Sequence, residues 1–143
     1  MKIIQPTSPS DWEKYLALRY EVLREPWNQP LGTEILADDS TSLNAMIIDA
    51  QGDALGVARL HETSPGVGQV RCVAIKTMQQ GKGLGKMLMN YLENEAIKLG
   101  LREIILEARE NAVPFYESLG YKITKKSYLL FGEIQHFTME KEL

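Results

Sequence analysis

The segment QQGKGLGK, Gln79–Lys86, places three glycines within five residues, directly before a long amphipathic stretch. Glycine loses more conformational entropy on folding than any other residue, and the start of a helix does not by itself require three of them. The segment therefore predicts a loop whose backbone is approached closely by another group.

The residues on either side of this loop predict a strand, a helix and a second strand. The apolar run VRCVAI, Val70–Ile75, precedes the loop, and apolar residues at helical spacing follow it from Leu84 to Leu99. Gly100 is suited to end that helix, and LREIILEA, residues 101–108, is typical of the next strand. Such a unit predicts two parallel strands joined by a right-handed crossover.

The remaining segments predict antiparallel pairs around this unit. MKIIQP is expected to form a short strand, and residues 8–26 a helix with a capping box between Ser10 and Glu13. Hairpins are expected over residues 42–62 and 121–143, with a short helix at residues 111–120. The chain is therefore expected to be one α/β domain over residues 1–143, with a mixed, mostly antiparallel sheet.

The composition excludes several classes of protein. The 143 residues carry a formal net charge of −3, which disfavours a nucleic-acid partner. The single cysteine, Cys72, rules out an internal disulfide, and with only two histidines it cannot make a Cys/His zinc cluster. No apolar run approaches the ~20 residues of a membrane span. We expect a cytoplasmic protein with no metal and no membrane partner.

A glycine loop between a strand and a helix start offers backbone N–H groups and the positive end of a helix dipole, which together bind phosphate. Two known phosphate motifs do not fit. A P-loop requires G-x-x-x-x-G-K-[ST], but Gly81 to Gly85 is one residue short and Met87 replaces the hydroxyl residue. A dinucleotide fingerprint requires G-x-G-x-x-G, and Lys86 stands at its third glycine.

A third pattern fits the loop. Residues 80–85, QGKGLG, match Q/R-x-x-G-x-G/A, and AVPFYESLGY, residues 112–121, matches A-x-x-x-Y-x-x-x-G-[FY]. The chain resembles a small single-domain bacterial branch of the GCN5-related N-acetyltransferase (GNAT) family. The resemblance lies in both motifs, in the order of elements and in the ending GEIQHFTMEKEL. The resemblance implies the acyl-CoA N-acyltransferase fold, with parallel strands around residues 70–75 and 102–108 that splay apart.

The resemblance also implies a site for acetyl-CoA as co-substrate. Its pyrophosphate would lie against the glycine-loop amides, and its pantetheine arm between the splayed strands. The residues implied to bind the coenzyme are Cys72, Val73, Ala74, Ile75, Gln80, Gly81, Lys82, Gly83, Leu84, Gly85, Lys86, Asn111, Phe115 and Tyr116.

Acyl transfer to an amine requires a base, oxyanion donors and an acid. Tyr116 falls on the motif tyrosine, which the resemblance implies is the acid that meets the departing sulfur. His136, on the last expected strand, can titrate near neutral pH and is the candidate base. His61, Glu62, Glu107 and a chain of waters to solvent are the alternatives.

The sequence allows two interpretations for each of three residues near the expected site. Asn111 either contacts the coenzyme or caps the following helix. Arg71, which strict alternation places on one strand face with Val73 and Ile75, contacts either an acidic group of the acceptor or a buried carboxylate. Cys72 is expected to be a small buried residue, and the alternative is a covalent acyl carrier.

We expect an N-acetyltransferase that moves an acetyl group from acetyl-CoA directly to a primary amine of a small molecule or peptide. The amine is expected to enter from the side formed by residues 24–34 and the C-terminal hairpin, and Asp38 and Asp39 either attract it or lie in a solvated loop. The alternative function is a non-catalytic acyl-CoA-binding or sensing domain, and the acidic charge disfavours a tRNA-directed acyltransferase. The sequence is compatible with a homodimer.

Overall fold

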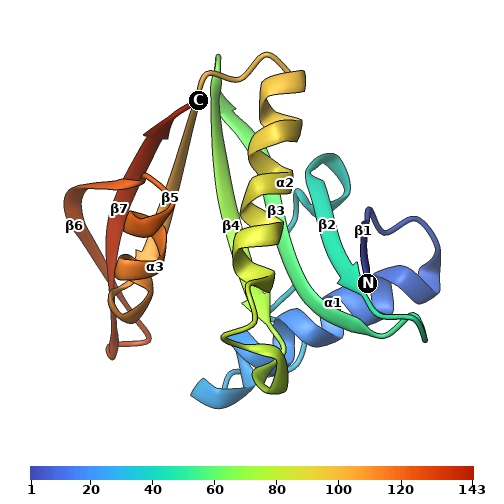
Figure 1. Cartoon of the computed structure of the whole chain (residues 1–143). Coiled ribbons are helices and arrows are strands. Elements are labelled where there is room, and N and C mark those ends of the chain that lie inside the picture. The colour runs from blue at the N-terminus through green and yellow to red at the C-terminus, as the bar shows by residue number, and fades with distance from the viewer.

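The computed structural model describes all 143 residues, Met1–Leu143, and contains one seven-stranded sheet with helices on both faces (Figure 1). The helices are α1 (Pro9–Leu23), α2 (Leu84–Lys98) and α3 (Val113–Ser118). The strands are β1 (Lys2–Ile4), β2 (Leu43–Ile48), β3 (Ala54–Ser64), β4 (Val67–Ile75), β5 (Glu103–Arg109), β6 (Lys122–Leu130) and β7 (Ile134–Glu142). The predicted order of elements is confirmed. None of the helices is long and apolar enough to cross a membrane.

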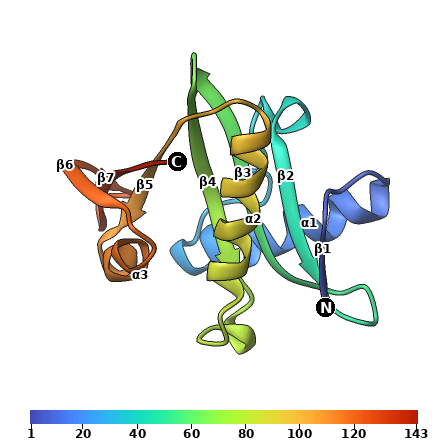
Figure 2. The same ribbon diagram turned by 45° about the horizontal axis from the view of Figure 1, so that its top comes forward.

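The strand order is β1-β2-β3-β4-β5-β7-β6, and every neighbouring pair is antiparallel except β4 and β5. The parallel ladder runs only from Val67, opposite Glu103, to Val70, opposite Leu106. Beyond that point the two strands diverge, as Figures 1 and 2 show. The predicted mixed sheet with one splayed parallel pair is therefore confirmed.

A β-bulge at Cys72 changes which way the residues of β4 face. Cys72 has a φ of 57°, and β4 gains one residue relative to β3 between the pairs Arg71–Arg59 and Ala74–Val57. Val73 and Ile75 pack on the core beneath α2, whereas Arg71 lies opposite Arg59 on the α1 side of the sheet. The predicted shared face of Arg71, Val73 and Ile75 is wrong, because a bulge interrupts period-two alternation.

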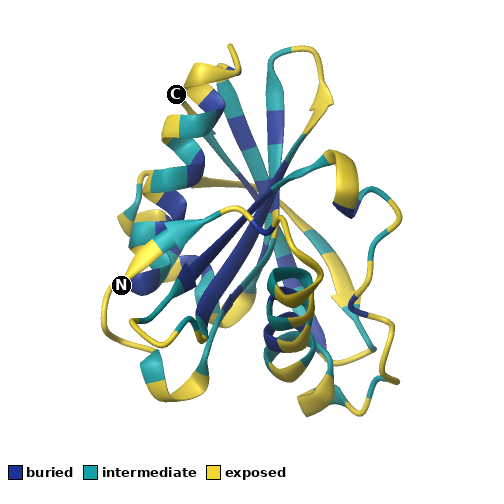
Figure 3. Ribbon diagram, turned by 90° about the vertical axis from the view of Figure 1, so that its right-hand side faces the viewer, coloured by how far each residue is buried: buried dark blue, intermediate teal, exposed yellow.

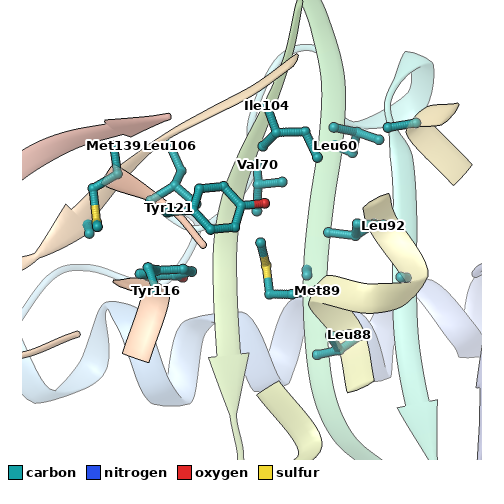
Figure 4. Packing of buried hydrophobic residues seen from close by; sticks show 14 of the residues in the cluster. Leu60, Val70, Leu88, Met89, Leu92, Ile104, Leu106, Tyr116, Tyr121 and Met139 are labelled. Carbon is teal, nitrogen blue, oxygen red and sulfur yellow. The ribbon is translucent and has the colours of Figure 1, made fainter. Parts of the chain in front are cut away.

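The larger apolar core fills the space between the sheet and the helices α2 and α3. Figure 3 shows that the buried residues lie on the central strands and on the inner sides of the helices. Figure 4 shows the rings of Tyr116 and Tyr121 beside Leu106 of β5, with Met89 and Leu92 of α2 opposite them. The core therefore continues from one diverging strand to the other, and fills the side of the sheet where the ladder is lost.

Polar contacts reinforce this connection. The hydroxyl of Tyr121 donates to a carboxylate oxygen of Glu93 on α2 at 2.9 Å, and the ammonium of Lys141 on β7 lies 2.8 Å from the other oxygen. Glu93 is thus held from the far side of the gap by two donors. These bonds fix α2 relative to the C-terminal strands.

The capping box of α1 lies two residues earlier than predicted. Ser8 Oγ accepts from the N–H of Asp11 at 3.0 Å, and the Asp11 carboxylate accepts from the N–H of Ser8 at 3.3 Å. The prediction of Ser10 with Glu13 is wrong because Pro9, which has no N–H and a helical φ, is suited to the first helical position. Its predecessor Ser8 then becomes the cap.

A buried charge network holds α1 and the loop after it against the sheet. Arg19 of α1 and Arg59 of β3 are 1% and 0% exposed, and both guanidinium groups donate to Asp39 at 3.0–3.1 Å. Asp38, whose side chain is half exposed, lies 2.6 Å from Arg59. Both aspartates are paired with arginines, which does not fit a role in attracting the amine. Asp39 is buried, so the solvated interpretation is wrong for it, whereas Asp38 keeps half of its side chain exposed.

Replacing Asp39 by asparagine should strongly destabilise the fold. The change leaves two buried guanidinium groups without their shared carboxylate, and breaking a buried ion pair costs about 3–5 kcal/mol. Asp38→Asn is the matched control, because its half-exposed ion pair is screened by solvent and should contribute about 1 kcal/mol or less. Urea unfolding followed by circular dichroism measures both values. Equal losses for the two variants would contradict this ranking.

Candidate functional site

A cleft of about 900 Å³ opens where β4 and β5 separate. Its walls are the ends of these two strands, the glycine loop with the start of α2, and α3. The end of α1 and the C-terminal hairpin close its other side. Every residue predicted to bind the coenzyme lines this cleft except Lys82, whose ammonium lies 3.4 Å from the side-chain oxygen of Gln79. Lys82 is therefore the one predicted contact that the structure does not bring to the cleft.

The three positions in the loop require glycine for different structural reasons. Gly81 and Gly83 have φ values of 79° and 83°, in the left-handed region that favours glycine, and a Cβ on either would meet no protein atom within 4 Å. Gly85 has ordinary helical geometry, but a Cβ there would lie 3.0 Å from the ring of Phe115. The space above Gly81 and Gly83 is open, whereas Gly85 is needed for the packing of α2 against α3.

Six consecutive backbone N–H groups, from Gly81 to Lys86, donate to no acceptor within the protein. Gly83 is the N-cap of α2 and offers no side-chain cap, so the first-turn amides stay free. Gln80 holds the loop in place through a 3.1 Å bond from its amide nitrogen to the carbonyl of Ile75. Free amides at the positive end of a 15-residue helix make a site for an anion.

The outer part of β4 gives the cleft an open strand edge. From Arg71 to Ile75 the strand pairs with β3 on one side, while its pairing with β5 on the other side ends at Val70. An unpaired edge of this kind can hydrogen-bond an extended chain that lies along it. A ligand with alternating donors and acceptors would fit between this edge and β5.

Tyr116 lies on α3 with its ring buried and its hydroxyl at the cleft. The residue is 8% exposed, and its ring makes edge-to-face contacts with Phe115 and Tyr121 at 5.0 and 5.9 Å between centroids. The hydroxyl makes no hydrogen bond to another protein atom and is free to donate to a ligand. Burial raises the pKa of Tyr116 well above its ordinary value, so the phenol stays protonated.

His136 lies on β7, opposite Arg109, with its ring stacked on Tyr128 at 4.4 Å. Its Nδ1 lies 2.9 Å from the carbonyl oxygen of Ile134. Because a carbonyl only accepts, Nδ1 carries the proton in the neutral ring and Nε2 keeps the lone pair. Burial lowers the pKa of His136, and the bond to Ile134 and the charge of Glu107 only partly oppose this.

The other candidate bases are less free. Glu107 lines the cleft, and its two carboxylate oxygens accept from the hydroxyl of Thr138 at 2.9 and 3.0 Å. His61 lies outside this cleft, 3.3 Å from the guanidinium of Arg59. Glu62 is exposed and accepts from the N–H of Gly66. Of the four side chains, only His136 and Glu107 face the cleft.

The structure bears on two of the other open interpretations, the cap formed by Asn111 and the burial of Cys72. Asn111 lines the cleft but caps nothing, because the N-cap of α3 is Ala112 and no side chain bonds to it. The capping role is therefore wrong. Cys72 is only half-buried at the bulge and lines the cleft, so it is not the buried residue that was expected. No group of three or more His, Cys, Asp and Glu side chains gathers where it could hold a metal ion.

Among the cleft residues that the sequence analysis did not predict are Arg24, Arg109 and Tyr128, whose side chains can contact a polar ligand. Arg24 directly follows α1, Arg109 ends β5, and Tyr128 lies on β6. Only Arg109 left a signal, because it stands seven residues before Tyr116, where many members of the suggested family carry a coenzyme-contacting asparagine. Arg24 and Tyr128 reach the cleft through the tertiary fold.

Comparison with known proteins gives consistent results. A family model described as "Acetyltransferase (GNAT) domain" matches residues 18–143. The uncharacterized N-acetyltransferase YjcF of Bacillus subtilis is 26% identical over 142 residues, which are 99% of this chain and 100% of that protein. The structure of an aminoglycoside 6'-N-acetyltransferase complexed with coenzyme A matches with a TM-score of 0.84 and 18% identity, over 99% of this chain and 97% of that one.

An acyl-CoA N-acyltransferase from Pseudomonas aeruginosa matches with a TM-score of 0.79 and 22% identity, over 98% of this chain and 97% of that one. At these identities the two solved structures show a common fold and no more. The family model, which spans residues 18–143, shows the family to which the chain belongs.

His136 should titrate below the ordinary histidine pKa and keep its neutral proton on Nδ1. Nitrogen NMR of the imidazoles measures both properties, and His61→Gln assigns the signals because the chain has two histidines. Since the folded-state pKa is lowered, the stabilising contribution of His136 is complete above about pH 6.5 and is lost as the pH falls toward the folded-state pKa. A midpoint above about 6.5 would show that Glu107 outweighs burial.

Proposed function

Because the chain belongs to the GNAT family of N-acetyltransferases, we propose that it transfers an acetyl group from acetyl-CoA to a primary amine of a small molecule or peptide. The observation that carries this proposal is the row of free amides from Gly81 to Lys86, which borders a cleft between two diverging strands. We further propose one catalytic domain over residues 1–143 and a cytoplasmic location. A homodimer stays a prediction.

The coenzyme fits the cleft in one direction. Its pyrophosphate would accept hydrogen bonds from the glycine-loop amides, with Lys86 at the same end of the cleft. Its pantetheine arm, which carries amides, would lie along the free edge of β4 from Arg71 to Ile75. This placement brings the thioester toward Tyr116 and the bulge at Cys72. The bound thioester supplies the activated acetyl group.

His136 is the proposed base. Its Nε2 lone pair can accept the proton that the amine loses as the new bond to carbon forms. Because burial lowers its pKa, the ring is neutral at pH 7 and ready for this role. Glu107, on the neighbouring strand, faces the same cleft and can hold an ammonium group before it is deprotonated.

Tyr116 is the proposed donor to the departing sulfur. As the bond from carbon to sulfur breaks, negative charge collects on sulfur, and a free phenol at the cleft can donate a hydrogen bond to it. The raised pKa of Tyr116 keeps the hydroxyl protonated throughout the working pH range. The same raised pKa makes complete proton transfer from Tyr116 less favourable, so its main role is donation to the developing thiolate.

The proposal is tested by measuring coenzyme thiol release with a broad panel of amines. Release that depends on an amine supports the enzyme. A protein that binds acetyl-CoA tightly but releases no thiol with any amine would instead be the non-catalytic binding domain.

Gly83→Asp should weaken coenzyme A binding far more than Gly83→Asn. Both side chains tolerate the left-handed φ of this position better than most, and they have nearly the same shape, so the pair isolates charge. A carboxylate about 5 Å from a phosphate at an effective dielectric of about 20 costs about 3 kcal/mol, so the affinities should differ at least tenfold. Calorimetry measures both, and equal affinities would place the pyrophosphate elsewhere.

Tyr116→Phe should lower the rate of the chemical step about 100-fold, the lower end of what acid assistance contributes, with little change in coenzyme affinity. The ring keeps its contacts with Phe115 and Tyr121, and only the hydroxyl is lost. Single-turnover kinetics measures the step. Tyr91→Phe is the control, because its hydroxyl bonds to Gln5 outside the cleft. An unchanged rate in Tyr116→Phe would assign the donor role to another group.

A further inference from the structure

Three arginines line the cleft without a carboxylate partner. Arg24, Arg71 and Arg109 all contribute to its wall, and none of them forms an ion pair with an aspartate or glutamate. The buried arginines Arg19 and Arg59, by contrast, share Asp39. The only carboxylate in the cleft wall is that of Glu107, which accepts from Thr138.

Each of the three guanidinium groups has N–H donors that no acceptor in the protein uses. The side chain of Arg71 makes no hydrogen bond within the protein, and Arg24 lies 5.6 Å from the ring centre of Phe131 with its Nε buried and unpartnered. Arg109 is positioned over Trp27 at 6.0 Å and makes one long bond, 3.5 Å, to the carbonyl of Leu23. Aromatic rings thus support two of these groups from one side and leave their edges free.

The three charges act on one region of the cleft, around Tyr128. Burial raises the pKa of Tyr128, the charge of Glu107 adds to this, and Arg71, Arg24 and Arg109 each oppose it. All three arginines line this one cleft although they come from β4, the end of α1 and β5. Arg71 faces the α1 side of the sheet, away from α2 and its glycine loop.

Arg24 and Arg109 are half-buried, whereas Arg71 is exposed at the mouth of the cleft. Burial and the charge of Arg24 lower the pKa of Arg109, so an acidic ligand between these groups would relieve the repulsion. Arginine presents a planar pair of N–H donors that matches a carboxylate or a phosphate. A built cluster of donors that no protein group uses is typical of a ligand subsite. Glu107, lying in the same wall, supplies the opposite charge for an ammonium group.

We propose that the acceptor carries an acidic group, a carboxylate or a phosphate, in addition to its amine, and that Arg71 with Arg24 and Arg109 binds that group. This inference rests on the proposed acetyl transfer. The amine then lies between Glu107 and His136, and the acid lies toward the end of α1. Uncharged and purely cationic amines are poor acceptors.

Matched pairs of amines test the proposal. A series of ω-amino acids of increasing length is compared with the corresponding amides, and O-phosphoethanolamine with ethanolamine, with kcat/KM as the readout. In the series that matches the subsite, kcat/KM of the acidic amine should exceed that of its neutral partner about ten- to hundredfold. This is the range expected for hydrogen bonds to charged groups. The two series distinguish carboxylate from phosphate.

Arg71→Gln should reduce this acid-to-neutral ratio to near one. Arg102→Gln is the matched control, because it removes the same charge from an exposed arginine outside the cleft and should keep the wild-type ratio. Coenzyme A affinity is measured for both variants. A large loss of that affinity in Arg71→Gln would assign the arginine to the coenzyme and overturn the proposal.

Binding provides a readout that does not depend on turnover. The N-acetylated acids and their amides are titrated by calorimetry into the protein, with and without coenzyme A. Tighter binding of the acids in wild type, lost in Arg71→Gln and kept in Arg102→Gln, supports the acid subsite even if no amine is acetylated, in which case the proposed transfer alone fails. Equal binding of acids and amides, or no binding of any acid, overturns the subsite.

Discussion

The short parallel ladder between β4 and β5 is the constraint on which the rest of the molecule depends. It pairs Val67 to Val70 with β5 and then stops, while each strand keeps its other neighbour, β3 or β7. The sheet therefore stays continuous at one end and opens at the other. The bulge at Cys72 turns β4 within this open part, and the core around Tyr121 joins the two halves by hydrogen bonding to Glu93 of α2. The cleft thus lies where strand pairing is interrupted within an otherwise well-packed sheet.

Much of the fold is predictable from sequence because its elements are locally consistent. Apolar periodicity and turn glycines identify the strands, the helix α2 and both hairpins, and the strand–helix–strand unit predicts the parallel pair. The errors arise where tertiary context overrides a local rule. A left-handed φ at Cys72, which is not a glycine, leaves no signal in the sequence, so strict alternation misplaces Arg71 relative to Val73. Pro9 did leave a signal for the start of α1, since it favours Ser8 as the cap.

The side of the candidate site formed by the glycine loop and α3 is predictable from sequence, and the side formed by the end of α1 and the C-terminal hairpin is much less so. The glycine loop and the tyrosine motif are contiguous in sequence, so their spacing carries the geometry, and Gly83 and Tyr116 both reach the cleft. For side chains on distant elements, separation along the sequence does not show which of them meet in the folded protein. The sequence allows Asp39 either to attract the amine or to lie in solvent, and only the tertiary fold places Arg59 against it. Arg24 likewise reaches the cleft only because the end of α1 borders the diverging strands.

The free amides at the start of α2 have a consequence for local stability. A helix whose first-turn donors meet only water lacks the stabilisation that a capping side chain contributes, about 1 kcal/mol, so this turn is among the parts of the molecule that open most readily. An anion that fills the loop acts as the missing cap. Folding and occupancy are then linked by mass action, and in a cell the lifetime of this turn follows the concentration of the ligand that closes it.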